Sequence, residues 1–329
     1  MKNFYKKIKI KKLEYIFIIF MLLIIQGIFI YNLENILSEK NFFDSYKIIN
    51  AIKNNNINEY GKSYMLTMKF FSLLRFSTLR EYNIFLYSIF FIFFIIYFWK
   101  NYSKNLFFII FDALFIILSA IYLIRPGKEI LQFLLIMICC KYPQKSYLLL
   151  FLGGILFRKY LLIQGLFFFI LKKIKISKYK KYLIILSLII FLLSSIVFSK
   201  QICEILNVRM ITNKSRQGSI YAVTIINNIL PFNGITFSYI NYLINTIRLL
   251  FPIELIFKGY KYLSYVVFQL WFTKKLWSWK YNLNDKVILL YSFILVSGIF
   301  EPDFGSFLRH TVPYLIVIRS KIYEKGDKK

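Results

Sequence analysis

Three long apolar runs constrain what this chain can fold into. They are YIFIIFMLLIIQGIFI (15–30), YNIFLYSIFFIFFIIYFW (82–99) and LFFIIFDALFIILSAIYLI (106–124). A helix needs about 20 mostly apolar residues to cross a bilayer, and these runs approach or reach that length. The first run has no small-residue cleavage site after it, so we interpret it as a retained signal anchor. The sequence predicts an all-α, polytopic integral membrane protein.

Lysine-rich segments set the predicted orientation. MKNFYKKIKIKK at the N-terminus and KKIKISKYKKY later in the chain carry the lysine clusters that are typical of cytoplasmic segments. Alternation from a cytoplasmic N-terminus gives about ten crossings and places both termini in the cytoplasm. The predicted outer segments are 32–81, 200–235 and 301–310, and the predicted cytoplasmic loops are 100–105, 172–182 and 274–286. We expect a single transmembrane domain over 1–329.

Several apolar segments are short for lipid-facing helices that cross a bilayer. They lie at 129–140, 146–157 and 160–171. Segments of this length are expected to form helices that are broken, re-entrant or buried in protein. Arg248 and Pro252 interrupt a further apolar run, for which we expect one net crossing.

The net charge of +29 does not indicate a nucleic-acid-binding protein. The lysines lie in short loops between apolar segments, which is the positive-inside pattern of membrane proteins. The single histidine excludes a multi-histidine metal site, and the three cysteines lack metal-ligand spacing. GKSY at 61–64 is a poor phosphate-binding loop, because Asn56 stands where the first glycine belongs. We therefore expect no metal, no cofactor and no nucleic-acid partner.

The arginines are distributed unequally across the predicted membrane. Eight of the nine fall at or near the outer face, and only the last falls on the cytoplasmic side: Arg75, Arg80, Arg125, Arg158, Arg209, Arg216, Arg248, Arg309 and Arg319. The guanidinium group binds phosphate through a planar fork of donors that lysine lacks. The pattern indicates an anionic ligand at the outer leaflet, and a lipid-linked diphosphate fits it. The alternative is that these arginines pair with outer carboxylates or contact lipid head groups.

The segment EPDFGSFLRH concentrates Glu301, Asp303, Arg309 and His310 after a late apolar run. We expect Arg309 to neutralise a diphosphate, and His310 to bind a phosphate or a sugar or to transfer a proton. The alternative is a capped turn with an interfacial histidine and an internal salt bridge.

Other candidate residues lie in predicted outer segments or next to them. Asp44 follows the first apolar run and is either a general base for an acceptor hydroxyl or a solvated loop residue. Arg125 precedes a short helix whose N-terminal N–H groups would add to phosphate binding. The remaining candidates for substrate binding are Arg158, Arg216 and Arg248. Arg248 lies within an apolar run, where an arginine is most costly.

FEPDFGSFLRH resembles the terminal motif of bacterial cell-surface polysaccharide polymerases of the Wzy type, including relatives of the EpsG family. TIRLLFPIELIFKGYKYLSYVVFQLW (246–271) and FRKYLLI (157–163) are similar to segments of those proteins. The resemblance implies a glycosyltransferase-C-like fold in the bacterial cytoplasmic membrane. It also implies that outer arginines act on oligosaccharide repeat units carried on undecaprenyl diphosphate. The residues in matching stretches are Arg158, Arg216, Arg248, Arg309 and His310.

From these features we expect an enzyme that polymerises such repeat units for O-antigen, capsule or exopolysaccharide. Fixed arginines would stabilise the leaving diphosphate without metal or nucleotide, and Asp44 or Glu301 would serve as the acceptor base. Its expected partners are the lipid-linked oligosaccharide, membrane lipids and a chain-length regulator. Two alternatives remain: a single-sugar glycosyltransferase with polyprenyl-phosphate donors, and a flippase or exporter of lipid-linked oligosaccharides.

Overall fold

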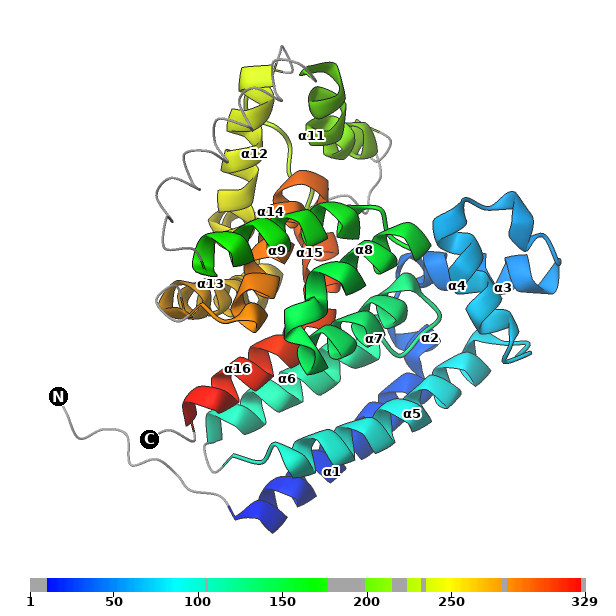
Figure 1. The fold of residues 1–329 in the computed structure, drawn as a ribbon. Coiled ribbons are helices and arrows are strands. Elements are labelled where there is room, and N and C mark those ends of the chain that lie inside the picture. The colour runs from blue at the N-terminus through cyan, green and yellow to red at the C-terminus, as the bar shows by residue number, and fades with distance from the viewer. Residues whose placement is uncertain are drawn as a thin grey trace, which may run out of the picture. The chain divides into compact units, whose positions relative to one another are not determined.

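A computed structural model describes residues 11–103, 106–176, 199–214, 224–231, 235–279 and 283–326 (Figure 1). Every regular element among them is a helix, which confirms the predicted all-α fold class. The run at 183–199 lies outside the described residues except for its last residue, and Arg216 also lies outside them. The chain divides into two compact units, unit 1 (Met1–Ile138 and His310–Lys329) and unit 2 (Cys139–Arg309). The single transmembrane domain expected over 1–329 stays a prediction.

Unit 1 contains the longest helices. Its elements are α1 (Lys12–Tyr31), α2 (Leu33–Ile36), η1 (Glu39–Phe42), α3 (Phe43–Lys53), η2 (Ile57–Glu59), α4 (Lys62–Ser72), α5 (Leu79–Lys100), α6 (Leu106–Tyr122), most of α7 (Lys128–Lys141), η6 (Val312–Tyr314) and α16 (Leu315–Gly326). A capping box starts α5, in which the Thr78 hydroxyl accepts from the Glu81 backbone N–H at 3.2 Å and the Glu81 carboxylate accepts from the Thr78 N–H at 3.1 Å.

Two contacts, one at each end of α1, show that α1 and α5 are antiparallel. At the start of α1, the Lys12 ammonium lies 4.2 Å from the centre of the Trp99 ring on the last turn of α5. At the end of α1, the Tyr31 ring lies 4.6 Å from the guanidinium of Arg80 on the first turn of α5. The two helices run side by side over most of their length (Figure 1). We call the two ends of unit 1 the Tyr15 end and the Tyr31 end, after the residues of α1 that mark them.

Helix α6 runs parallel to α1. The Tyr15 hydroxyl donates to Asp112 near the start of α6 at 2.5 Å. Further along both helices, the Gln26 amide donates to the Ser119 hydroxyl at 3.0 Å. The apolar helices α1, α5 and α6 therefore alternate in direction along the chain, as successive membrane crossings would.

Two described helices, α1 and α5, are long and apolar enough to cross a membrane, and Phe107–Tyr122 is a shorter apolar helix. At 1.5 Å per residue, a 20-residue helix such as α1 spans about 30 Å, the thickness of a bilayer's hydrocarbon core. Helix α1 has exposed apolar side chains, among them Phe17, Ile25 and Ile28. They form an apolar face that is available for contact with lipid. The count of about ten crossings stays a prediction.

Unit 2 consists of shorter helices. Its elements are η3 (Pro143–Lys145), α8 (Ser146–Leu156), α9 (Tyr160–Ile176), α11 (Ser199–Lys214), α12 (Ile235–Leu250), η4 (Ile253–Lys258), η5 (Tyr260–Tyr262), α13 (Leu263–Trp279), α14 (Asp285–Phe300) and most of α15 (Phe304–Thr311). The predicted interruption of the apolar run is present, because α12 ends at Leu250 and Pro252 precedes η4. The proline ring lacks the N–H that would continue a helix.

Helix α14 forms the core of unit 2 and is buried along most of its length, between α9 and α12. Gly298 allows α12 to approach closely, because a Cβ atom there would lie 2.0 Å from the Thr246 hydroxyl. Gly154 allows a similar approach of α8 and α9, with the Leu162 Cγ 2.5 Å from the position of a Cβ. These tight contacts fix the helices that hold the polar residues of unit 2.

A short main-chain pairing joins two loops of unit 2. Ile225 forms an isolated antiparallel bridge with Asp303. The Ile226 N–H donates to the Pro302 carbonyl at 3.0 Å, and the Phe304 N–H donates to the Thr224 carbonyl at 3.3 Å. The EPDFG turn is thereby fixed to the segment 224–231, which we call the asparagine segment after Asn227 and Asn228.

Candidate functional site

Three predicted site residues, Asp44, Arg125 and His310, belong to unit 1. Asp44 lies on the first turn of α3, and Arg125 lies in the loop that joins α6 to α7. The Ser45 hydroxyl donates to the Pro126 carbonyl at 2.8 Å and so holds α3 against this loop. The two residues therefore lie together at the Tyr31 end.

Arg125 is buried, yet its surroundings are polar and aromatic. One of its guanidinium nitrogens donates to the Asn41 carbonyl. The rings of Phe42 and Tyr122 lie 5.9 and 5.7 Å from its guanidinium carbon, within the range of a cation–π interaction. These contacts hold the guanidinium in one position, as a fixed anion-binding group requires.

Asp44 is held by a tyrosine that also contacts two lysines. The Tyr64 hydroxyl donates to Asp44 Oδ1 at 2.6 Å. The ammonium groups of Lys128 and Lys47 lie 3.3 and 4.6 Å from the centre of the Tyr64 ring. Asp44 is only half-buried, so a ligand can reach its carboxylate. A carboxylate that is held in one orientation near cations can act as a general base where a substrate hydroxyl comes within hydrogen-bond reach.

His310 contacts a buried acid of the same unit. Its Nε2 lies 3.7 Å from Oε1 of Glu129 on the first turn of α7. Gly127, in the same loop as Arg125, lies so near that a Cβ atom there would be 2.8 Å from the Glu129 carboxylate. Asp44, Arg125, Lys128, Glu129 and His310 thus form one group, which we call the unit 1 cluster.

The opposite end of unit 1 holds a fully buried ion pair. Arg319 Nε donates to Asp112 Oδ1 at 2.7 Å, and both side chains are 0% exposed. Arg319 also donates to the Asn101 carbonyl at 2.7 Å, and its guanidinium carbon lies 4.3 Å from the centre of the Phe108 ring. With the Tyr15 hydroxyl on Oδ2 of Asp112, the three side chains join α1, α6 and α16.

The arginines of unit 1 are thus separated by the fold itself. Arg80 contacts Tyr31, Arg75 lies in the turn before α5, and Arg125 contacts Asn41 and Phe42 just beyond α1. Arg319 alone among the arginines of unit 1 lies at the Tyr15 end, and a carboxylate neutralises it. Arg319 was also expected to lie apart from these three arginines, on the cytoplasmic side of a membrane, and that topology stays a prediction.

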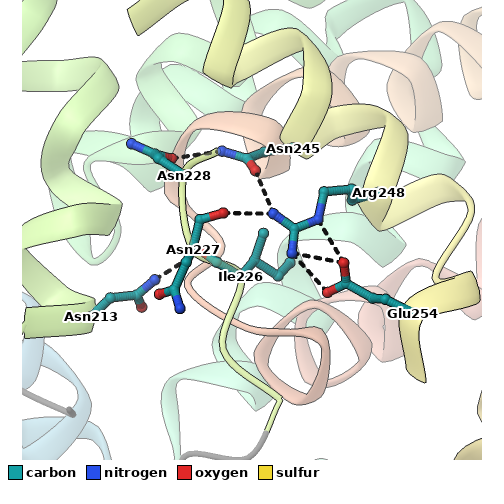
Figure 2. Close-up of polar contacts among 7 residues, drawn as sticks. All are labelled: Asn213, Ile226, Asn227, Asn228, Asn245, Arg248 and Glu254. Carbon is teal, nitrogen blue, oxygen red and sulfur yellow. Dashed lines mark hydrogen bonds and ion pairs between the residues drawn. The ribbon is translucent and has the colours of Figure 1, made fainter. Parts of the chain in front are cut away.

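In unit 2, Arg248 is the centre of a polar network (Figure 2). Its Nε and one terminal nitrogen each donate to Glu254 at 2.8 Å, which is a bidentate ion pair. Its other terminal nitrogen donates to the Asn227 carbonyl at 2.6 Å and to Asn245 Oδ1 at 3.3 Å. Arg248 therefore secures the asparagine segment to α12.

Asparagines on α11 and α12 make further contacts with the asparagine segment. The Asn213 amide on α11 donates to the Ile226 carbonyl at 3.0 Å (Figure 2). The Asn241 side chain bonds both the N–H and the carbonyl of Leu230, at 3.0 and 3.1 Å. Carboxamides donate and accept at once, so they can bond main-chain N–H and C=O groups of this segment beyond its short pairing with the EPDFG turn.

The remaining predicted residues of unit 2 are Arg158, Glu301 and Arg309. Arg158 is buried and donates to the Tyr160 hydroxyl at 2.7 Å. The Tyr160 ring lies 6.1 Å from that of Phe300, the residue before buried Glu301. Arg158 and Glu301 therefore lie in the same part of unit 2, and Arg309 is half-buried on α15.

Sequence reasoning missed two groups that the structure shows. Asp112 and Tyr15 were not singled out, although an acid within an apolar run is a recognisable signal. The asparagines of α11, α12 and the segment 224–231 were also missed, because asparagine is common throughout the chain.

Among the described residues, no three His, Cys, Asp or Glu side chains lie close enough to hold a metal ion. Comparisons with protein-family models, curated proteins and solved structures found no match for this chain.

Proposed function

We propose that the protein is a polytopic enzyme of the bacterial cytoplasmic membrane that polymerises oligosaccharide repeat units carried on undecaprenyl diphosphate. In each step a hydroxyl oxygen of the acceptor repeat unit bonds to the anomeric carbon of the donor. The bond from that carbon to the diphosphate breaks, undecaprenyl diphosphate leaves with the electron pair, and the hydroxyl proton passes to a base. The free energy of the diphosphate linkage drives the step.

The observation that carries the proposal is the unit 1 cluster. A buried guanidinium, a lysine and a histidine lie at the same end of a helical unit as a half-buried carboxylate, whereas the arginine at the other end is neutralised. Fixed cations stabilise a leaving group on which negative charge develops. An oriented carboxylate beside them can take the proton of the attacking hydroxyl.

The roles follow from these positions. Arg125 and Lys128 bind the diphosphate of the donor, and His310, oriented by Glu129, donates a hydrogen bond to the leaving oxygen. Asp44, oriented by Tyr64, accepts the proton of the acceptor hydroxyl. Arg309, Arg158 and Arg216 keep their predicted role in binding phosphate, and Glu301 stays an alternative base.

The alternating directions of α1, α5 and α6 support repeated membrane crossings in this proposal. If the Tyr15 end faces the cytoplasm, as the lysine-rich N-terminus predicts, the unit 1 cluster faces the outside. Lys11, before α1, and Lys53, at the end of α3, are both exposed. In a variant without native cysteines, Lys53→Cys should react with a membrane-impermeant thiol reagent in intact cells, and Lys11→Cys only after permeabilisation. The reverse result would refute the proposed orientation.

The catalytic proposal is tested by complementing a deletion strain of the natural host with Arg125→Gln. Loss of a charge-assisted hydrogen bond to the diphosphate, worth about 1.5–3 kcal/mol, should slow polymer formation at least about tenfold. Complete lipid-linked repeat units should accumulate, as measured by gel analysis of polymer and mass spectrometry of extracted lipids. Lys53→Gln on α3 is the matched control and should make polymer normally. Wild-type polymer from Arg125→Gln at normal protein levels would refute the proposal.

One observation favours a second candidate function. Asp44 lies just beyond the first apolar helix and is oriented by Tyr64, as a single-sugar glycosyltransferase with a polyprenyl-phosphate donor also needs. The two functions differ in what an Asp44→Asn strain accumulates. A polymerase variant should accumulate complete single repeat units, whereas a single-sugar transferase variant should accumulate repeat units that lack one sugar.

A further inference from the structure

The asparagine segment borders two hollows of unit 2. The larger has a volume of about 510 Å³, and its polar lining consists of Asn227, Asn228, Arg248 and Glu254. The smaller, about 310 Å³, shares Asn227 and Asn228 with it and reaches Asn213 on α11. The larger volume falls within the about 300–1,000 Å³ that is usual for small-molecule sites.

The charge of the larger hollow is close to balanced. Glu254 binds Arg248 through both carboxylate oxygens, with the shortest contact at 2.7 Å. The third guanidinium nitrogen is bonded to the Asn227 carbonyl and to Asn245. An arginine whose three guanidinium nitrogens all bond to the protein, and whose charge a carboxylate neutralises, is poorly suited to bind a phosphate. The hollow therefore favours an uncharged ligand.

Carboxamides in this region have capacity left for hydrogen bonding. The exposed side chain of Asn227 makes no hydrogen bond within the described part of the chain; only its main-chain carbonyl is used, by Arg248. The Asn213 Oδ1 atom is buried and likewise has no hydrogen-bond partner among the described residues. A carboxamide offers donors and an acceptor side by side, which matches the hydroxyl groups of a sugar ring.

The segment that carries these groups is held in place before any ligand binds. Asn213 and Asn241 fix its two ends through main-chain atoms, and the bridge of Ile225 to Asp303 fixes its start. Ile229 and Ile247 add apolar surface at the border of the hollow, against which the C–H face of a pyranose can lie. Binding groups held in this way lose little conformational entropy when a ligand binds.

We propose that this hollow is a subsite for an uncharged sugar residue of the lipid-linked repeat unit, and that Arg248 serves the sugar and not a phosphate. The inference rests on the proposed function for the identity of the ligand. Arginines other than Arg248 would then bind the diphosphate, and unit 2 would bind a sugar residue.

The inference is tested by photo-crosslinking in cells of the natural host. Benzoylphenylalanine replaces Ile229, at the hollow, or in a matched control Ile155, which is 70% exposed on α8. After irradiation the purified protein is examined for carbohydrate by periodate–hydrazide labelling and mass spectrometry. Carbohydrate on the Ile229 variant and none on the Ile155 variant is the expected result. Adducts without carbohydrate at Ile229, or equal carbohydrate at both positions, would overturn the inference.

A kinetic measurement gives independent support. Membranes that contain the Asn227→Ala variant are supplied with lipid-linked repeat units extracted from the deletion strain. Loss of a ligand hydrogen bond should raise the apparent KM about fivefold and leave kcat within about twofold. Because the Asn227 side chain bonds nothing within the described fold, the change reports on the ligand. Asn35→Ala, an exposed asparagine of α2, is the control. An unchanged KM for Asn227→Ala would overturn the inference.

The two proposals fail in different ways. If the wild-type membranes make no polymer but the Ile229 adduct carries sugar, polymerisation is refuted and the sugar subsite stands. If polymer forms but the Ile229 adduct carries no sugar, the polymerase stands and the subsite is refuted.

Discussion

Each unit contains an arginine bound bidentately to a carboxylate, and the two pairs differ in exposure. In unit 1, Arg319 and Asp112 are completely buried. In unit 2, the side chains of Arg248 and Glu254 are 20% and 31% exposed and lie at the edge of a hollow. The same chemistry therefore serves two purposes. A buried pair without access can only hold helices together, whereas a pair at a hollow can also orient a ligand.

The difference in burial also predicts a difference in energy. Removing one partner of a buried pair leaves a charge without compensation, which costs about 3–5 kcal/mol, whereas exposed pairs contribute about 0–1 kcal/mol. Variants that remove one partner of each pair measure this difference.

The largest effect is expected for Asp112→Ala. Arg319 would keep its charge in a buried site, so the free energy of unfolding should fall by about 3–5 kcal/mol. Unfolding of the purified protein by SDS, followed by circular dichroism, measures the change. The double variant Asp112→Leu with Arg319→Leu should recover most of the loss, because no buried charge remains. A single variant as stable as the wild type would show that water reaches this pair.

A smaller effect is expected for Tyr15→Phe. The change removes the hydroxyl that donates to Asp112 at 2.5 Å and keeps the ring in place. A hydrogen bond to a charged group contributes about 1.5–3 kcal/mol, and we expect a loss in that range. The same SDS titration measures it, with Tyr31→Phe at the other end of α1 as the control. A loss as large as that of Asp112→Ala would mean that Tyr15 holds the pair by itself.

The smallest effect is expected for Glu254→Gln in unit 2. The pair is partly exposed, so its loss should change the free energy of unfolding by less than about 1 kcal/mol. The variant should instead alter ligand binding, because Arg248 would then present a net positive charge to the hollow. Inorganic pyrophosphate should inhibit polymer formation by this variant more strongly than by the wild type, as the polymer assay measures. A loss of stability as large as that of Asp112→Ala would contradict the expected difference between the two ion pairs.

The sequence was sufficient to predict the helices but not the way they pair. Apolar runs of helical length predicted the all-α fold, and Pro252 predicted the break after α12, because both are local signals. The ion pair of Asp112 with Arg319 joins residues 207 positions apart, and no local pattern indicates such a contact. Arg125 and Asp44 were predicted separately as site residues, but only the fold shows that Ser45 and Pro126 bring them together.

The main-chain bridge between the asparagine segment and the EPDFG turn restricts the length of both loops. Ile226 pairs with Pro302, and the next residue presents its carbonyl to Arg248. An insertion of one residue between Ile226 and Asn227 would place a different carbonyl opposite the guanidinium of Arg248. It would also turn the side chain that follows to the other face of the segment. Homologous chains that keep this arrangement should therefore vary in residue type here but not in residue number.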